Sequence, residues 1–343
     1  GVRIGPLLRY EALAPSMVAV GLLAVHGRWR PSLALAAGAT VPLVLFAGFL
    51  VSNGLYPLPN SVIAKMGGGQ VDELPIDNRL LLKLAIAMIL VPGWALILLV
   101  VGGLVTAAAC GARRWALGGW LALSTAGICA AHLALGTVDR IGRYEVYAIA
   151  FGMGAFLVIA GRLSAKPSRY AVLAVAIGLG TLSVWYQYYL SGWGLWSPQA
   201  IRLQQGEMGR FAKEVWKAPV AVNDLGMVSW KNPNYVLDLW GLASSAALEK
   251  MREDPVQPGW GGELAERYGA GMAMLYADRL DHVIPDDWIV MGELRLDRPW
   301  GYVAGPDVTF YATRPEAVEP LREALATFVP GLPSGAVWTP ANE

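Results

Sequence analysis

The stretch Gly54-Leu-Tyr-Pro-Leu-Pro-Asn-Ser-Val-Ile-Ala-Lys65 lies in the longest polar gap between two apolar runs of membrane-crossing length. Pro57 and Pro59 fix their own backbone and push the residues before them away from helical geometry, so the stretch begins extended or turned. Asn60 and Ser61 then offer side chains that can begin a short helix. Irregular backbone at membrane depth is tolerated where it is buried in protein or lines a cavity. We therefore expect this loop to border a functional cavity.

The composition indicates that part of the chain lies in lipid. Of its 343 residues, 55% are hydrophobic and 15% are charged, whereas soluble domains carry about 25% charged residues. Residues 1–201 hold an excess of Lys and Arg, and residues 202–343 hold an excess of Asp and Glu. The sequence thus predicts a transmembrane domain over 1–201 and a soluble domain over 202–343. The acidic second part argues against nucleic acid as a partner.

Cysteine and histidine are sparse. The two cysteines, Cys110 and Cys129, fall in or beside apolar runs, where a cysteine is usually a small core residue. The three histidines are scattered along the chain. Neither residue type shows the spacing of a metal site or of a disulfide framework, so the sequence predicts no metal ligands.

Charge-free runs predict six membrane-spanning helices, because a helix needs about 20 residues to cross a bilayer. The runs are Ala12–Val25, Pro31–Ser52, Leu84–Ala112, Trp115–Val138, Val146–Gly161 and Tyr170–Ile201. Lys and Arg are denser in one set of short connections, which places that set in the cytoplasm. The outer face then holds loops 53–83 and 137–145 and the whole C-terminal domain. Six spans also place Gly1 on the outer face, so we expect further helices upstream of it.

Residues 202–343 predict one small extracytoplasmic α/β domain of two or three layers. The expected strands are Pro219–Val222, Tyr235–Leu239, Met272–Tyr276, Trp288–Met291 and Val308–Ala312. Helices are expected at Gln204–Trp216 and Glu316–Phe328. We expect the Pro- and Gly-rich tail after Val329 to be mobile. The predicted fold class is a polytopic α-helical membrane protein with a C-terminal α/β domain.

Three polar segments beside the spans are candidate binding sites, because polar residues at membrane depth often carry function. Asn60 and Lys65 can hold a phosphate or a sugar; the alternative is an ordinary interhelical turn with Lys65 reaching to the membrane interface. Arg9 and Glu11 stand directly before the first span and, two residues apart, do not share a helix face. They can point toward a substrate and a neighbouring helix, or simply anchor the end of the span.

The third segment, Asp139-Arg-Ile-Gly-Arg-Tyr-Glu145, places two arginines in one short outer loop. The guanidinium groups of Arg140 and Arg143 suit phosphate oxygens well, which makes this the best anion site in the sequence. The alternative is a loop closed by its own salt bridges.

Asp224 and Asp238 each end a predicted strand shortly before a glycine. For both we expect a turn held by the carboxylate, with the glycine supplying a positive φ.

Several of these motifs resemble those of one group of proteins. Leu58-Pro-Asn-Ser-Val-Ile-Ala-Lys65 resembles the Pro-Asn-Thr…Ala-Lys loop of bacterial membrane glycosyltransferases with the GT-C fold, and the similarity is closest to terminal arabinofuranosyltransferase-like proteins. Arg9-Tyr10-Glu11 resembles their Arg-Pro-Glu/Asp motif, and Arg143-Tyr144 resembles an arginine-aromatic pair in a later outer loop. Asn223-Asp-Leu-Gly226, followed by Val236-Leu-Asp-Leu-Trp-Gly-Leu242, is similar to the start of their extracytoplasmic domain.

Two positions depart from the family pattern. Ser61 stands where Thr is usual, and Tyr10 replaces a proline, which puts the local turn in doubt. The catalytic Asp or Glu of the family, in its first outer loop, has no match in this sequence. The resemblance therefore implies that the catalytic base lies upstream of Gly1.

The resemblance implies transfer of a sugar, such as arabinofuranose or mannose, from a polyprenyl-phosphate donor to a cell-envelope glycan or glycoconjugate in the bacterial plasma membrane. Its partners would be the bilayer, the lipid-linked sugar and the glycan acceptor, with no tightly bound cofactor and the need for a divalent metal left open. The implied donor-binding residues are Asn60, Lys65, Arg140, Arg143 and Tyr144. The implied supporting residues are Arg9, Glu11, Pro59 and Ser61.

The competing hypothesis is a membrane protein without catalysis, either a transporter subunit or an assembly scaffold with an outer domain. A transporter typically shows paired broken helices or charges deep within its spans. Here Pro92 is the clear interruption of a long span, and no span carries a central charge. The sequence therefore favours the scaffold over the transporter as the alternative to an enzyme.

Overall fold

The computed structural model describes residues 10–66, 84–110, 116–136, 138, 144–162, 167–253 and 256–341. For residues 11, 65, 66, 162, 167–176 and 179 it describes the backbone but not the side chain. The chain divides into two compact units. The helical unit comprises Gly1–Pro57 and Gly67–Trp185, and the sheet unit comprises Leu58–Met66 and Tyr186–Glu343. Segment 58–66 and residues 186–201, predicted as part of the transmembrane domain, thus cluster with the C-terminal residues.

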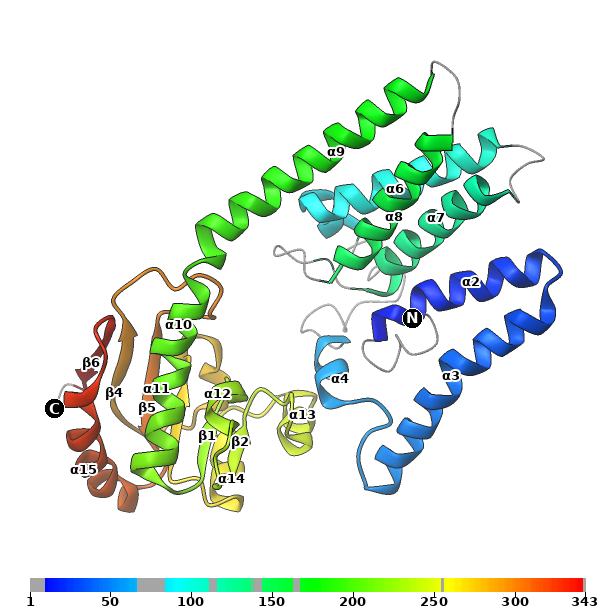
Figure 1. The fold of residues 1–343 in the computed structure, drawn as a ribbon. Helices are drawn as coiled ribbons and strands as arrows, with labels where there is room; N and C mark the ends of the chain where they lie inside the picture. Colours follow the sequence, from blue (N-terminus) through cyan, green and yellow to red (C-terminus); the bar gives the residue numbers. More distant parts are fainter. Residues whose placement is uncertain are drawn as a thin grey trace. The chain divides into compact units, whose positions relative to one another are not determined.

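The helical unit is built from apolar helices that follow the charge-free runs of the sequence (Figure 1). Their bounds are α2 Leu13–Val25, α3 Trp29–Ser52, α6 Val91–Ala109, α7 Leu117–Leu135, α8 Val146–Arg162 and α9 Pro167–Tyr189. A short 3₁₀ turn, Tyr10–Ala12, precedes α2. Among the described residues, α3, α6 and α7 are long and apolar enough to cross a bilayer, while α2 and α8 are shorter. These helices indicate a membrane protein.

The predicted run Leu84–Ala112 is not one continuous helix. Residues 84–89 are helical, Leu90 is extended with φ −95° and ψ 136°, and α6 begins at Val91. Pro92 causes the break, because its ring clashes with the carbonyl four residues earlier and it has no N–H to donate. At the start of a new helix the same proline is well tolerated.

The helical unit packs through small side chains and a small apolar core. Leu96, Ile128 and Cys129 are buried where α6, α7 and α8 meet. A side chain on Gly103 of α6 would come within 2.6 Å of the carbonyl oxygen of Ala122 on α7. The two helices therefore approach closely because one of them carries a glycine at the contact, which is common in membrane helix packing.

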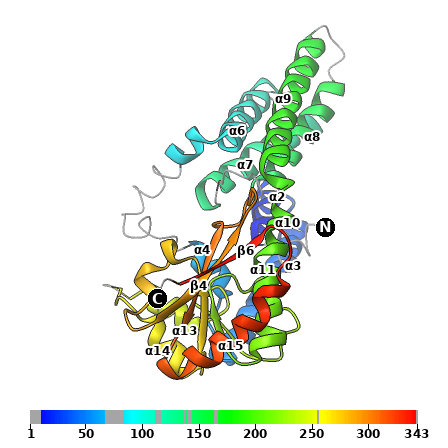
Figure 2. The same cartoon turned by 90° about the vertical axis from the view of Figure 1, so that its left-hand side faces the viewer.

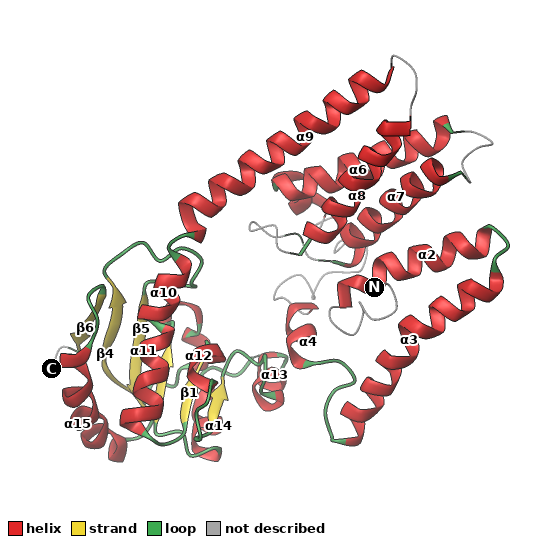
Figure 3. Ribbon diagram, in the orientation of Figure 1, coloured by secondary structure: helices red, strands yellow, loops and turns green. Residues whose placement is uncertain are grey.

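The sheet unit contains all the strands of the described residues (Figure 3). They are β1 Val220–Val222, β2 Val236–Asp238, β3 Met272–Leu275, β4 Ile289–Leu296, β5 Asp307–Ala312 and β6 Ala336–Pro340. They form one sheet in the order β2-β1-β3-β5-β4-β6. Strands β2, β1 and β3 are parallel, and the remaining pairs are antiparallel. Four of the first five strands match their predicted segments, and β4 begins as predicted but runs on to Leu296.

Strand β6 contradicts the prediction of a mobile tail after Val329. It pairs antiparallel with β4 (Figure 2). The Trp338 ring packs edge-to-face on Phe310 with ring centroids 5.1 Å apart. Without this partner, β4 would leave its backbone N–H and C=O groups unpaired at an edge of the sheet. Pairing with a distant strand outweighs the local Pro and Gly content of the tail.

Helices cover both faces of the sheet, so the unit has three layers. One core includes Phe211, Val222 and Phe328 and packs against α11 and α15; the other includes Leu237, Leu264 and Ala273 and packs against α13 and α14. The helices are α4 Asn60–Met66, α10 Ser197–Leu203, α11 Gln205–Arg210, α12 Leu225–Ser229, α13 Ser245–Met251, α14 Gly261–Arg267 and α15 Val318–Phe328. Turns of π-helix cover Leu190–Gly194 and Phe211–Trp216, and 3₁₀ turns cover Ala277–Arg279, Asp281–Val283, Pro315–Ala317 and Val329–Gly331.

Candidate functional site

The loop that opens with Pro57 and Pro59 leads into the short helix α4, as expected from Asn60 and Ser61. The carbonyl of Pro59 accepts the backbone N–H groups of Val62 at 2.8 Å and Ile63 at 3.1 Å. Asn60 and Ser61 are half-buried. The two prolines cannot continue α3, and the helical φ/ψ region becomes available again only after Pro59. The sequence thus fixes where α4 begins.

Asn60 contacts a residue far away in the sequence. Its Nδ2 donates to Oγ of Ser245, at 3.1 Å, across 185 positions of chain. Ser245 is the first residue of α13, and its Oγ lies 3.5 Å from Oδ1 of Asn60. Figure 1 shows α4 beside α13. The predicted donor-binding loop therefore packs on the sheet unit.

Most of the other predicted site residues fall outside what the structure describes. Arg9, Arg140 and Arg143 lie outside the described residues, as do the side chains of Glu11 and Lys65, so the anion site predicted for Arg140 and Arg143 stays a prediction. Tyr144 is half-buried in the turn two residues before α8, and its backbone N–H donates to Oε2 of Glu145 at 3.1 Å.

The polar residues of the sheet unit meet at one edge of its sheet. Asn223 and Asp224 directly follow β1, Asp238 ends β2, and Tyr276 directly follows β3. Because β2, β1 and β3 are parallel neighbours, their carboxyl ends share this edge. The chain leaves β1 toward β2 on one side and returns past β1 to β3 on the other, which makes the end of β1 a switch point of the topology. Ligands of open α/β sheets bind at such points.

Asp238 is almost fully buried, at 1% exposure, and holds the loop that follows β2. Its Oδ1 accepts the backbone N–H of Trp240 at 2.9 Å, and its Oδ2 accepts that of Ala243 at 2.7 Å. Gly241 in this loop has φ 73°. The expected turn, held by a carboxylate with a left-handed glycine, is confirmed here. Burial still raises the pKa of Asp238, while the backbone N–H groups oppose the rise.

Asp224 does not form the expected turn. Helix α12 begins at the next residue, so Gly226 has helical geometry, and no backbone N–H of that helix caps on the Asp224 carboxylate. The carboxylate instead accepts a hydrogen bond from Nε2 of Gln205. Burial raises the pKa of Asp224, and the charge of Asp238 adds to the rise, while the hydrogen bond from Gln205 opposes it. The local sequence indicated a turn, because no local pattern shows that a helix starts at Leu225.

Tyr276 and Gln204 complete the edge, although no motif in the sequence marks either of them as a site residue. The Tyr276 hydroxyl donates to Oε1 of Gln204 at 2.7 Å, and Nε2 of Gln204 donates to the carbonyls of Gly305 and Pro306 at 3.0 and 3.1 Å. The backbone N–H of Tyr276 donates to Oδ1 of Asn223 at 3.1 Å. Burial raises the pKa of the Tyr276 phenol above its usual value, so it stays a neutral donor at pH 7.

We expect the Asp224 carboxyl to shape how stability depends on pH. An acid with a raised pKa in the folded state binds its proton more tightly when folded, so stability falls as pH rises from the ordinary value toward the raised one. Asp224→Asn keeps an oxygen for Gln205 and cannot ionise. The variant should gain stability relative to wild type as pH rises from about 4 to 7. Unfolding midpoints measured at both pH values test this.

The exposed Asp287 provides the matched control, because Asp287→Asn makes the same substitution at the surface of the same unit. An Asp224→Asn variant that tracks wild type at every pH would contradict the assignment of a half-buried carboxylate whose pKa is raised in the folded state.

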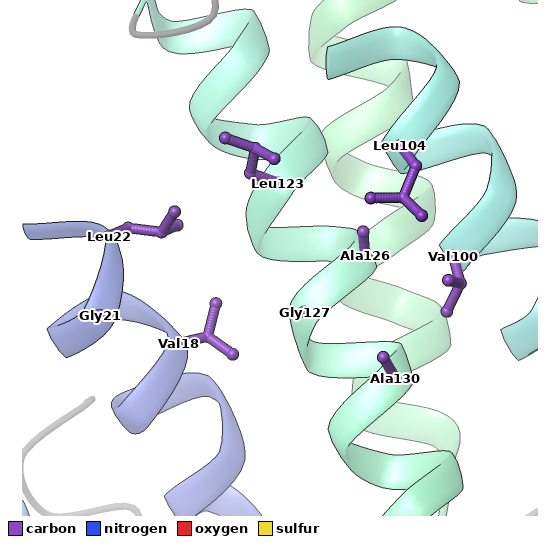
Figure 4. A pocket seen from close by; sticks show the side chains of 9 residues that line it. All are labelled: Val18, Gly21, Leu22, Val100, Leu104, Leu123, Ala126, Gly127 and Ala130. Carbon is purple, nitrogen blue, oxygen red and sulfur yellow. The ribbon is translucent and has the colours of Figure 1, made fainter. Parts of the chain in front are cut away.

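The edge is polar, with Asp224 its half-buried member and Asp238 buried, whereas the described cavity in the helical unit is apolar. That cavity, of about 380 Å³, lies among α2, α6 and α7 (Figure 4). Its lining carries no polar side chain; it consists of Val18, Gly21, Leu22, Val100, Leu104, Leu123, Ala126, Gly127 and Ala130. Within the described ranges, no group of three or more His, Cys, Asp or Glu side chains is placed to hold a metal ion.

Comparison with known proteins adds one match. Residues 196–311 match a family model described as a domain of unknown function, DUF8728. The match runs from the start of α10 into β5, so it includes Gln204, Asp224, Asp238 and Tyr276 and leaves out α4 and β6. No curated protein and no solved structure matches the chain.

Proposed function

We propose that this chain is a GT-C-type membrane glycosyltransferase that moves a sugar from a polyprenyl-phosphate donor to a cell-envelope glycan or glycoconjugate. The contact between Asn60 and Ser245 carries the proposal. It joins the Leu58–Lys65 loop to Ser245, three residues after the segment Val236–Leu242, and both the loop and this segment resemble the family. Stretches far apart in the sequence thus meet in one compact unit, as parts of a shared site would.

In the proposed reaction, a hydroxyl of the acceptor attacks the anomeric carbon of the donor sugar. The bond from that carbon to the phosphate oxygen breaks, polyprenyl phosphate leaves with the bonding electrons, and a carboxylate takes the proton of the hydroxyl. Cationic side chains of the outer loops, Lys65, Arg140 and Arg143, stabilise the charge on the departing phosphate. Asn60 and Tyr144 orient the donor, and Arg9, Glu11, Pro59 and Ser61 support these loops.

The apolar helices support the same proposal, because a lipid-linked donor must reach its enzyme from the bilayer. The proposed location is the bacterial inner membrane, with the C-terminal domain on the outer face. On that face the acidic sheet unit meets the envelope acceptor, and the half-buried carboxylate of Asp224 at the strand edge accepts one of its hydroxyls.

A transfer assay tests the proposal. The full-length protein in nanodiscs is offered a panel of radiolabelled polyprenyl-phosphate sugars, and Asn60→Ala and Arg143→Ala are assayed beside it. We expect one donor to be consumed and each variant to lose at least about tenfold in rate, the loss typical of a positioned polar group at a reacting centre. Asn53→Ala, which removes an exposed amide at the end of α3, should transfer at the wild-type rate.

A second candidate function is a non-catalytic membrane scaffold or transporter subunit. The hydrogen bond of Asn60 also fits it, because the contact with Ser245 docks α4 on α13 whether or not a substrate binds. If wild-type protein consumes and binds no donor in the panel, the scaffold takes the place of the enzyme.

A further inference from the structure

We propose that Ser245 is a positioning residue that holds α4, and with it Asn60, on the sheet unit. More than one hydrogen bond supports this role, because several contacts fix the loop from Asp238 to Ser245 and so fix the position of the Ser245 hydroxyl. Its bearing on catalysis rests on the function proposed above. Its structural part, the docking of α4 on α13, stands independently.

The loop is fixed at its start by the Asp238 carboxylate. This nearly inaccessible group accepts the N–H groups of Trp240 and Ala243 with its two separate oxygens, so both are committed to the loop. A carboxylate that receives two charge-assisted hydrogen bonds defines the backbone on either side closely. The turn cannot shift along the chain without leaving two donors unpaired.

The middle of the loop is pressed against α13. A side chain on Gly241 would lie 3.0 Å from the backbone nitrogen of Leu248, and its φ of 73° disfavours other residues. Helix α13 is then capped by Ser244, whose buried Oγ accepts the N–H of Ala247 at 3.2 Å. This bond satisfies one of the donors that every helix start leaves free.

The two adjacent serines, Ser244 and Ser245, therefore have different roles. Ser244 faces inward and completes the helix, while the half-exposed Ser245 places its Oγ 3.1 Å from Nδ2 of Asn60. In the described residues Ser245 makes no other side-chain hydrogen bond, so its hydroxyl serves the contact with α4. The geometry explains why α4, which the chain reaches directly from α3, clusters with the sheet unit.

Amide hydrogen exchange of the full-length protein in detergent tests the docking. Ser245→Ala should speed exchange in residues 60–66 by about three- to tenfold, the range for losing one neutral hydrogen bond. Ser245→Thr retains the hydroxyl and should restore wild-type exchange. Ser229→Ala, which removes an exposed serine of the same unit, should leave these amides unchanged. Adding Ser245→Ala to Asn60→Ala should have no further effect, because the partner is already gone.

The transfer assay separates this proposal from the proposed function. If Ser245 positions the loop, Ser245→Ala should lower kcat with little change in KM for the donor, and Ser245→Thr should rescue it. Faster exchange in Ser245→Ala without any transfer by wild type would keep the docking and overturn the enzyme. Wild-type transfer combined with unchanged exchange in Ser245→Ala would keep the enzyme and overturn the docking.

Discussion

Replacing Phe211 by alanine is expected to lower the free energy of unfolding of the sheet unit by about 3–5 kcal/mol. Phe211 is fully buried at the centre of one core. Its ring packs edge-to-face on Phe328 of α15 and Phe310 of β5, with centroids 4.8 and 5.7 Å apart. Alanine would leave a cavity between helix and sheet and remove both ring contacts.

The loss is large against the whole stability of a domain, which is about 5–15 kcal/mol. Hydrogen exchange of the β1, β3 and β5 amides in the full chain measures it, because these central strands exchange through opening of the whole unit. Met227→Ala removes an apolar side chain that is 39% exposed and should cost far less. Equal effects of the two variants would mean that Phe211 is not at the centre of the core.

Replacing Gly292 by alanine is expected to cost roughly 2–5 kcal/mol, combining overpacking with backbone strain. Gly292 lies at the irregularity of β4, opposite Pro340 of β6, with φ 149°. A side chain there would lie 2.4 Å from the Trp338 ring and 2.6 Å from the carbonyl oxygen of Thr339. Strand β6 would have to move, which would give up its pairing with β4 and the contact of Trp338 with Phe310.

Exchange should therefore rise first in β6 and along β4, and less in β1 and β3. Gly226→Ala is the matched control, because Gly226 lies in α12 with open space around it. There the added methyl group should be neutral or stabilise by about 0.5–1 kcal/mol. Wild-type exchange in β6 of Gly292→Ala would contradict the pairing of the tail.

Local patterns were sufficient for much of the sheet unit. The segment Met272–Tyr276 is a continuous apolar run and becomes the buried strand β3, and Glu316–Phe328 has helical periodicity and contains α15. The secondary structure of such segments can be predicted from sequence because their own apolar side chains must be buried. The prediction for the tail after Val329 was wrong because the tail is ordered by pairing with β4, and no local pattern reveals a partner strand.

In the candidate site, too, some residues can be identified from local sequence and others only from long-range contacts. Asn60 is recognisable from the prolines before it, and Asp238 from the turn after its strand. The partner of Asn60 is 185 positions away, and Ser245 carries no signal that separates it from any other serine. Gln204 and Tyr276 likewise become polar neighbours only once β3 and the start of α11 are brought together.

The apolar helices, the break at Pro92, the start of α4 and the segments of the first five strands could be predicted from sequence, because each depends on the burial or backbone limits of nearby residues. It took the folded structure to show that α4 belongs to the sheet unit, that the tail forms β6 and that Asp224 accepts a hydrogen bond from Gln205. These features depend on hydrogen bonds between distant segments, whose partners are set when the chain folds.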